Sequence, residues 1–170
     1  MQRFLVVALT AMIAGSANAQ DPNNELRRLS ETVESISDVS LTAPYVSARC
    51  GGLYDGILGY GGDSLPEEVR EQYSLSANVF TFASAVMRVD NAHTSGRGST
   101  ELDPNIKQAF LESERFKAIY IERFRVNYDL RGSMLAGDEL SKDDITFCQE
   151  VFPASEAIAS KALGRDVMAQ

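Results

Sequence analysis

The chain has 170 residues, a formal net charge of −8 and two cysteines, and 44% of its residues are hydrophobic. An acidic chain repels nucleic acids and anionic membranes, because binding to them depends on neutralisation of phosphates by Lys and Arg. The composition therefore argues against a nucleic-acid-binding protein and indicates one domain with one hydrophobic core.

Residues 1–19 have the three parts of a cleavable secretory signal. Arg3 supplies the positive charge, residues 4–15 form an uncharged, mostly apolar run, and Ala17 and Ala19 are the small residues that a signal peptidase recognises. The run is shorter than the roughly 20 apolar residues that a membrane-spanning helix needs. We expect cleavage after Ala19, export to a bacterial periplasm or the medium, and no membrane insertion of the mature protein.

The rest of the chain has helical periodicity, and strand-like alternation is scarce. Residues 20–41 are predicted to be an N-terminal amphipathic segment with a helix over 24–39. The predicted apolar stripe of that helix consists of Leu26, Leu29, Val33 and Ile36. Residues 42–170 are predicted to be an all-α domain: an antiparallel bundle of about four principal helices with short helices at both ends.

The first two bundle helices have recognisable start signals. Thr42 is expected to cap a helix with Pro44 in its first turn, ending at residues 59–62. A capping box at 64–67 predicts the next helix, which runs to about Asp90. The expected buried residues are Val46, Cys50, Leu53 and Ile57 in the first of these helices, and Val69, Tyr73, Phe80, Ala83 and Met87 in the second.

The second half of the bundle begins after a turn-rich connection at 93–100. The longest helix is predicted from Asp103 to about Arg131, with Gly132 as its C-terminal stop. A last helix is capped by the 141–144 segment and runs to Phe152. Pro153 is expected to break or kink it before a final piece over 155–163.

The two cysteines are predicted to form a disulfide. Cys50 shares a helix face with Val46 and Leu53, and Cys148 shares one with Ile145 and Phe152, so both thiols should point into the core. An even count of cysteines in an exported chain favours pairing. The alternatives are two buried free thiols or a redox pair, and a Cys-x-x-Cys motif is absent.

Small residues cluster in the helix that carries Cys50. Ala48, Gly52 and Gly56 are spaced i, i+4, i+8, although glycine costs about 1 kcal/mol against alanine inside a helix. One hypothesis is close packing against small residues of the next helix, a second is a ligand lying along this ridge beside tyrosines, and a third is that the glycines break the helix. The small residues are Ser76, Ala77, Ala83, Ser84 and Ala85, and the tyrosines are Tyr45, Tyr54 and Tyr60.

Residues for catalysis, metal or cofactor binding do not form a recognisable pattern. His93 is the single histidine, so a multi-histidine zinc site cannot be built, and no nucleophile–base pair is evident. We expect the protein to have no enzymatic activity and to bind no metal ion and no cofactor. The favoured function is an exported soluble protein that binds another protein; the alternatives are a carrier or sensor of a small apolar or aromatic ligand, and an enzyme without a recognisable motif.

Overall fold

A computed structural model describes residues 26–36 and 38–167 of the chain. The predicted secretory signal, residues 1–19, lies outside the described residues, as does the start of the N-terminal segment. The described elements, in chain order, are α1 (Leu29–Ser35), α2 (Val39–Gly61), the short 3₁₀ helix η2 (Gly62–Ser64), α3 (Glu67–Ser95), α4 (Leu102–Arg131) and α5 (Glu139–Leu163).

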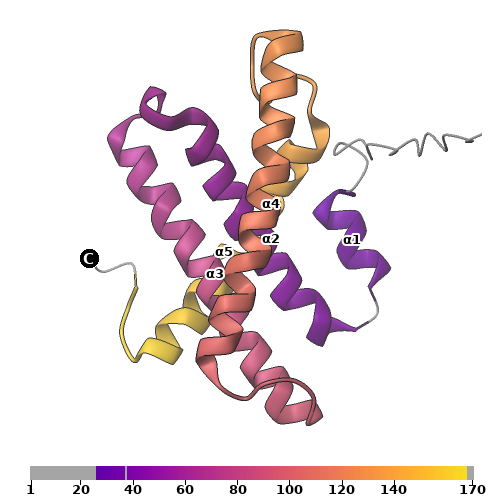
Figure 1. The fold of residues 1–170 in the computed structure, drawn as a ribbon, viewed down its shortest axis with the longest axis vertical. Helices are drawn as coiled ribbons and strands as arrows, with labels where there is room; N and C mark the ends of the chain where they lie inside the picture. Colours follow the sequence, from indigo (N-terminus) through magenta and orange to yellow (C-terminus); the bar gives the residue numbers. More distant parts are fainter. Residues whose placement is uncertain (1–25, 37, 168–170) are drawn as a thin grey trace, which may run out of the picture.

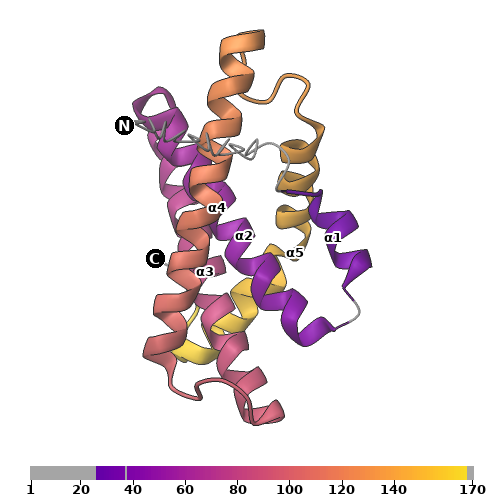
Figure 2. The ribbon, with the colours of Figure 1, turned by 45° about the vertical axis from the view of Figure 1, so that its right-hand side comes forward.

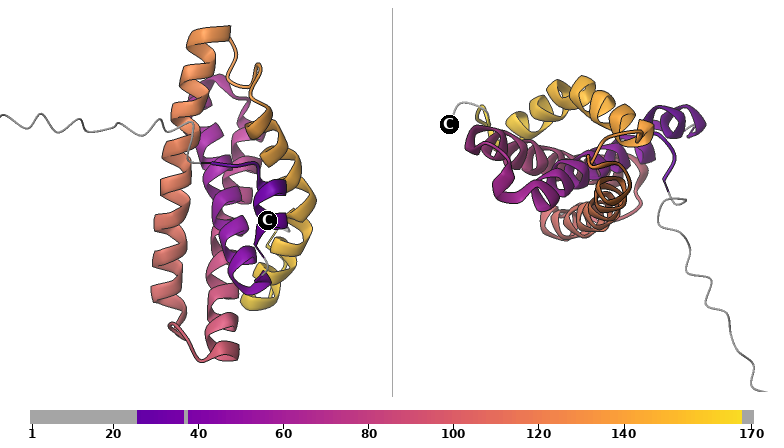
Figure 3. Two further views of the ribbon diagram at one scale, coloured as in Figure 1. Left: turned by 90° about the vertical axis from the view of Figure 1, so that its right-hand side faces the viewer. Right: turned by 90° about the horizontal axis from the view of Figure 1, so that it is seen from above.

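The helices form the predicted antiparallel bundle (Figure 1). The α2–α3 hairpin lies in the middle, with α4 on one side and α5 on the other, as the left view of Figure 3 shows. The short helix α1 lies against α5 at the outside of the bundle (Figure 2). The expected all-α fold with one disulfide is confirmed.

The main core lies where α2 meets α3, α4 and α5. Side chains from all of these helices are buried there, and aromatic rings contact one another across the helix interfaces. Its largest fully buried side chains include Leu53, Phe80, Tyr120 and Phe124, all 0% exposed. Burial of aromatic side chains of this size supplies much of the folding energy of a small domain.

The N-terminal predictions were wrong at their helix boundaries. α1 covers Leu29–Ser35 rather than 24–39, and α2 begins at Val39 rather than after Thr42. The Thr42 hydroxyl donates to the carbonyl of Asp38 at 2.7 Å, one turn back, and does not cap the helix start. Pro44 consequently lies inside α2 instead of in its first turn.

The α2–α3 connection also differs from the prediction. Ser64 is the last residue of η2 and donates its hydroxyl to the Gly61 carbonyl, and Pro66 occupies the N-cap position of α3 without a side-chain hydrogen bond. A capping box is therefore not formed. α3 runs to Ser95, past the predicted Asp90, and places the exposed His93 in its last turn.

The second half of the chain follows the prediction more closely. α4 ends at Gly132, whose φ of 70° is left-handed, as expected for a C-terminal stop. α5 is capped by Asp138, which accepts a hydrogen bond from the Ser141 amide at 3.2 Å, rather than by the 141–144 segment. Of the two outcomes expected at Pro153, the break is wrong, because α5 continues through this residue to Leu163. The helix bows around the bundle (Figure 3), in agreement with the other expectation, a kink.

Candidate functional site: an apolar cavity beside a buried ion pair

The two cysteines form the predicted disulfide. Cys50 of α2 and Cys148 of α5 are bonded with their Cα atoms 5.6 Å apart, and both are completely buried. The bond joins residues 98 positions apart in the sequence. It fixes the outer helix α5 to the middle of the bundle.

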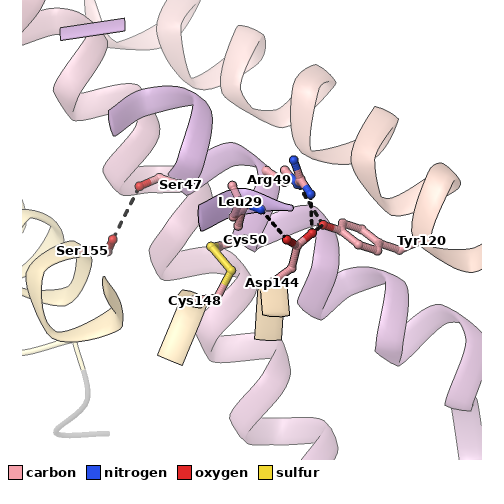
Figure 4. The surroundings of a disulfide bond; sticks show 8 residues. All are labelled: Leu29, Ser47, Arg49, Cys50, Tyr120, Asp144, Cys148 and Ser155. Atoms are coloured by element: carbon pink, nitrogen blue, oxygen red, sulfur yellow. Dashed lines mark hydrogen bonds and ion pairs between the residues drawn. A yellow bond between two sulfur atoms is a disulfide. The ribbon is translucent and has the colours of Figure 1, made fainter. Parts of the chain in front are cut away.

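A buried ion pair lies next to this disulfide (Figure 4). Arg49, the residue before Cys50, pairs with Asp144, one turn before Cys148, and both side chains are 0% exposed. The Tyr120 hydroxyl of α4 also donates to the Asp144 carboxylate. Because breaking such a pair leaves an uncompensated buried charge, the two partners are strongly coupled to the fold.

Further hydrogen bonds connect this ion pair to the segment before α2. Arg49 donates to the Arg27 carbonyl at 2.6 Å and to the Tyr45 hydroxyl at 3.2 Å, and its Nε atom donates to the Tyr120 hydroxyl at 2.9 Å. The amide of Leu29, the first residue of α1, donates to the Asp144 carboxylate at 2.7 Å. One polar cluster therefore holds α1, α2, α4 and α5 together.

Burial and charge act in opposite directions on the groups of this cluster. Removal from water raises the pKa of the Asp144 carboxyl, although Arg49 and the hydrogen bonds from Tyr120 and Leu29 oppose that change. Burial alone would lower the pKa of Arg49, but Tyr120 and Asp144 outweigh it and raise the pKa above its ordinary value. The guanidinium stays charged. The enclosed cluster is thus fully engaged in contacts between helices.

An apolar cavity of about 310 Å³ opens between α1, α2 and α5. α3 contributes a single side chain to it, Met87. The lining carries no Asp, Glu, Lys, Arg or His, and aliphatic side chains predominate. The lining residues are Val33 from α1, Ile36 directly after it, Thr42, Ala43, Val46 and Ser47 from α2, Met87 from α3, and Phe147, Val151, Ala154, Ser155 and Ile158 from α5.

Two serine hydroxyls are the polar atoms deepest in this cavity. Ser47 and Ser155 are 3% and 4% exposed. Their oxygens point toward each other at 3.5 Å (Figure 4), a distance at which a hydroxyl–hydroxyl hydrogen bond is weak. The remaining hydroxyl in the lining, that of Thr42, already donates its proton to the Asp38 carbonyl. The serine pair therefore has hydrogen-bonding capacity to offer a ligand.

The glycine ridge lies away from this cavity, against α4. A Cβ atom on Gly52 would lie 2.5 Å from the Cβ of Phe116, and one on Gly56 would lie 2.9 Å from the Cβ of Tyr120. The sequence analysis predicted that this ridge packs against small residues of α3. For Gly52 and Gly56 that prediction was wrong. Only the neighbouring Gly51 faces α3, through Thr81 and the Ala77 carbonyl, together with Ser113 of α4.

The tyrosines proposed to flank a ligand at the ridge are engaged in the core. Tyr45 meets Phe116 edge-on at 5.4 Å between ring centroids. Tyr54 stacks on Phe80 at 5.8 Å and contacts Tyr73 at 5.2 Å. Neither tyrosine, and neither Gly52 nor Gly56, lines the apolar cavity.

A second surface feature lies between α3 and α4. Ile106 and Phe110 of α4 are exposed, Phe110 by 53%, and they line an open groove of about 560 Å³ with Phe82 of α3. Asp103 and Lys107 stand at its edge. Exposed apolar residues that gather in one groove are typical of a contact surface for another protein.

Within residues 26–36 and 38–167, no group of three His, Cys, Asp or Glu side chains could hold a metal ion. None of the helices in these residues combines the length and the hydropathy needed to cross a bilayer.

The ion pair and the cavity were both missed by the sequence analysis. Asp144 was interpreted as part of a cap, and Arg49 was not singled out, although an arginine between apolar and glycine positions of α2 was a usable signal. The chain matches no protein-family model, and comparisons with curated proteins and with solved structures found no match either.

Proposed function

We propose that this is an exported binding protein that holds a small, uncharged apolar molecule in the cavity between α1, α2 and α5. The observation that carries the proposal is the lining of that cavity: about 310 Å³ of space, walled by aliphatic side chains and free of charged groups. Small-molecule sites are concave and mostly apolar, with a few placed polar groups. The Ser47–Ser155 pair supplies those groups.

The cavity walls are held in place by covalent and ionic links. The Cys50–Cys148 bond fixes α5 to α2. The Asp144 carboxylate holds the amide of Leu29 at the start of α1. Because all three walls are fixed before a ligand arrives, binding does not have to order them.

The lining supports binding rather than catalysis. Its polar side chains are hydroxyls of Ser and Thr, and no acid, base or histidine lies beside them to activate a nucleophile. The perturbed carboxylate of Asp144 and the Arg49 guanidinium are enclosed elsewhere. A ligand in the cavity would therefore leave chemically unchanged.

Binding of a neutral apolar dye tests this proposal with matched variants of α5. Ala154 lines the cavity and is exposed, so Ala154→Phe should fill its mouth and abolish binding of naphthalene, a neutral fluorescent dye of ten carbons. Ala157 is exposed on the same helix but outside the lining, so Ala157→Phe should bind as the wild type does. Equal dye binding by both variants would refute the proposal.

The α3–α4 groove favours a second candidate function, binding of an apolar segment of another protein. The specific observation is the exposed pair Ile106 and Phe110 beside Phe82. A photo-crosslinking amino acid at position 110 should then yield a discrete adduct in the native compartment. The same group at Leu130, which is 70% exposed and outside the groove, should not. Equal or absent adducts would remove this candidate.

A further inference from the structure

We infer that the cavity takes a linear aliphatic molecule whose neutral hydroxyl or carbonyl group enters first and bonds to Ser47 and Ser155. This inference rests on the proposed function and names the class of its ligand. An apolar cavity of about 150 Å³ holds one benzene. The 310 Å³ observed here therefore fits roughly ten to twelve carbon atoms.

The walls indicate an aliphatic rather than an aromatic ligand. The larger apolar side chains of the lining are those of Val, Ile and Met, with Phe147 as the one aromatic among the lining residues. Recognition of a ring usually uses ring-to-ring contacts with centroids about 4.5–7 Å apart. The tyrosines that could supply such contacts are engaged with other core rings.

Burial within the lining shows which end of the ligand would meet the serines. Val46, Ser47 and Ser155 are among its buried residues, so they form the floor, whereas Ala154 is exposed at the mouth. A hydroxyl or carbonyl at the floor would bond to the two serine oxygens, which now face only each other. The aliphatic chain would then extend along the walls to the mouth.

Charge at the floor decides between neutral and ionised head groups. Among the residues that the structure describes, no Lys, Arg or His lines the cavity, so a carboxylate beside Ser47 would be a buried charge without a partner there. The neutral hydroxyl needs only the hydrogen bonds that the serine pair can make. A primary alcohol should therefore bind better than the carboxylate of equal length.

Displacement of naphthalene, which at ten carbons is within the expected capacity, by the 1-alkanols from six to fourteen carbons measures this inference on the mature protein. Each added methylene should tighten binding about fourfold, and the gain should stop at roughly ten to twelve carbons. 1-Decanol should displace the dye at lower concentration than decanoate at pH 7. The double variant Ser47→Ala/Ser155→Ala should weaken 1-decanol about two- to tenfold, and Ser74→Ala, on the exposed side of α3, should not.

The possible outcomes separate this inference from the proposed function. Replacement of both serines by alanine leaves no buried hydroxyl without a partner. The variant should therefore remain folded, which circular dichroism measures. If the dye binds at the cavity but alcohols and carboxylates displace it equally, and the double variant changes nothing, the head-group assignment is wrong while the binding site stands. If Ala154→Phe leaves dye binding unchanged, the proposed function itself has failed.

Discussion

Substitution of Gly52 by alanine should destabilise the protein because the backbone of α2 lies in close contact with α4 there. The added Cβ would meet the Ser113 carbonyl oxygen, the Cβ of Phe116 at 2.5 Å and the Lys117 amide nitrogen at 2.9 Å. These atoms belong to the α4 backbone or to its first side-chain carbon, so none can rotate away. One of the two helices must shift.

The expected change in the free energy of unfolding is the sum of two opposing effects. Overpacking costs about 1–3 kcal/mol, and the contact with backbone places Gly52→Ala near the upper end. Better helix propensity returns about 1 kcal/mol. The net loss should be about 2 kcal/mol, which lowers the Tm of a domain of this size by about 4–8 °C.

Gly59→Ala is the matched control on the same helix. Its Cβ would meet the end of the Ile121 side chain at 2.9 Å, and that flexible methyl can move aside. The control should be neutral or up to about 1 kcal/mol more stable. Thermal and urea unfolding of both variants measures the difference. If Gly52→Ala proves as stable as Gly59→Ala, the close-packing account of the ridge is wrong.

Four further outcomes are expected. Reduction of the Cys50–Cys148 bond should lower the Tm clearly, since closing a loop of about 100 residues is worth up to about 4.7 kcal/mol; an unchanged Tm in a scan with reductant would contradict this. Asp144→Asn should cost about 3–5 kcal/mol in urea unfolding, because it leaves its arginine partner charged and buried, and a loss below 1 kcal/mol would show that the pair is dispensable. Hydrogen bonds from an arginine and a serine lower the pKa of Asp138 against the opposing effect of burial. Its stabilising contribution is therefore present above the unfolded pKa near 3.9 and is lost as the pH falls through the lower folded value. The stability difference between the wild type and Asp138→Asn should shrink between pH 7 and pH 2, and a constant difference would refute that sign. N-terminal sequencing of the exported protein should begin at Gln20, and retention of residues 1–19 in a membrane fraction would disprove the predicted processing.

The parts of the fold that could be predicted are those encoded locally. The α4 helix has a long amphipathic repeat and ends at Gly132, so both its extent and its stop were visible in the sequence. The disulfide followed from two cysteines on apolar helix faces. Helix starts were less predictable, because Thr42 and Ser64 can bond backward to a carbonyl as readily as they can cap an amide.

The candidate site depended on contacts between distant segments. Arg49 and Asp144 are 95 positions apart, and nothing in either local sequence identifies the other as its partner. The small residues of α2 predicted a close helix contact, but small side chains do not specify which neighbouring helix fills the space. The cavity is the volume that three helices leave unfilled, which no single stretch of sequence contains.

Methyl NMR of the mature protein labelled at methionine tests the binding site most directly. Met87 lines the cavity, whereas Met134 packs against the main core and does not line it. Titration with 1-decanol should shift the Met87 methyl resonance saturably and leave that of Met134 in place. An unmoved Met87 resonance at saturating alcohol, or a shift at Met134 instead, would contradict the assignment of this cavity as the ligand site.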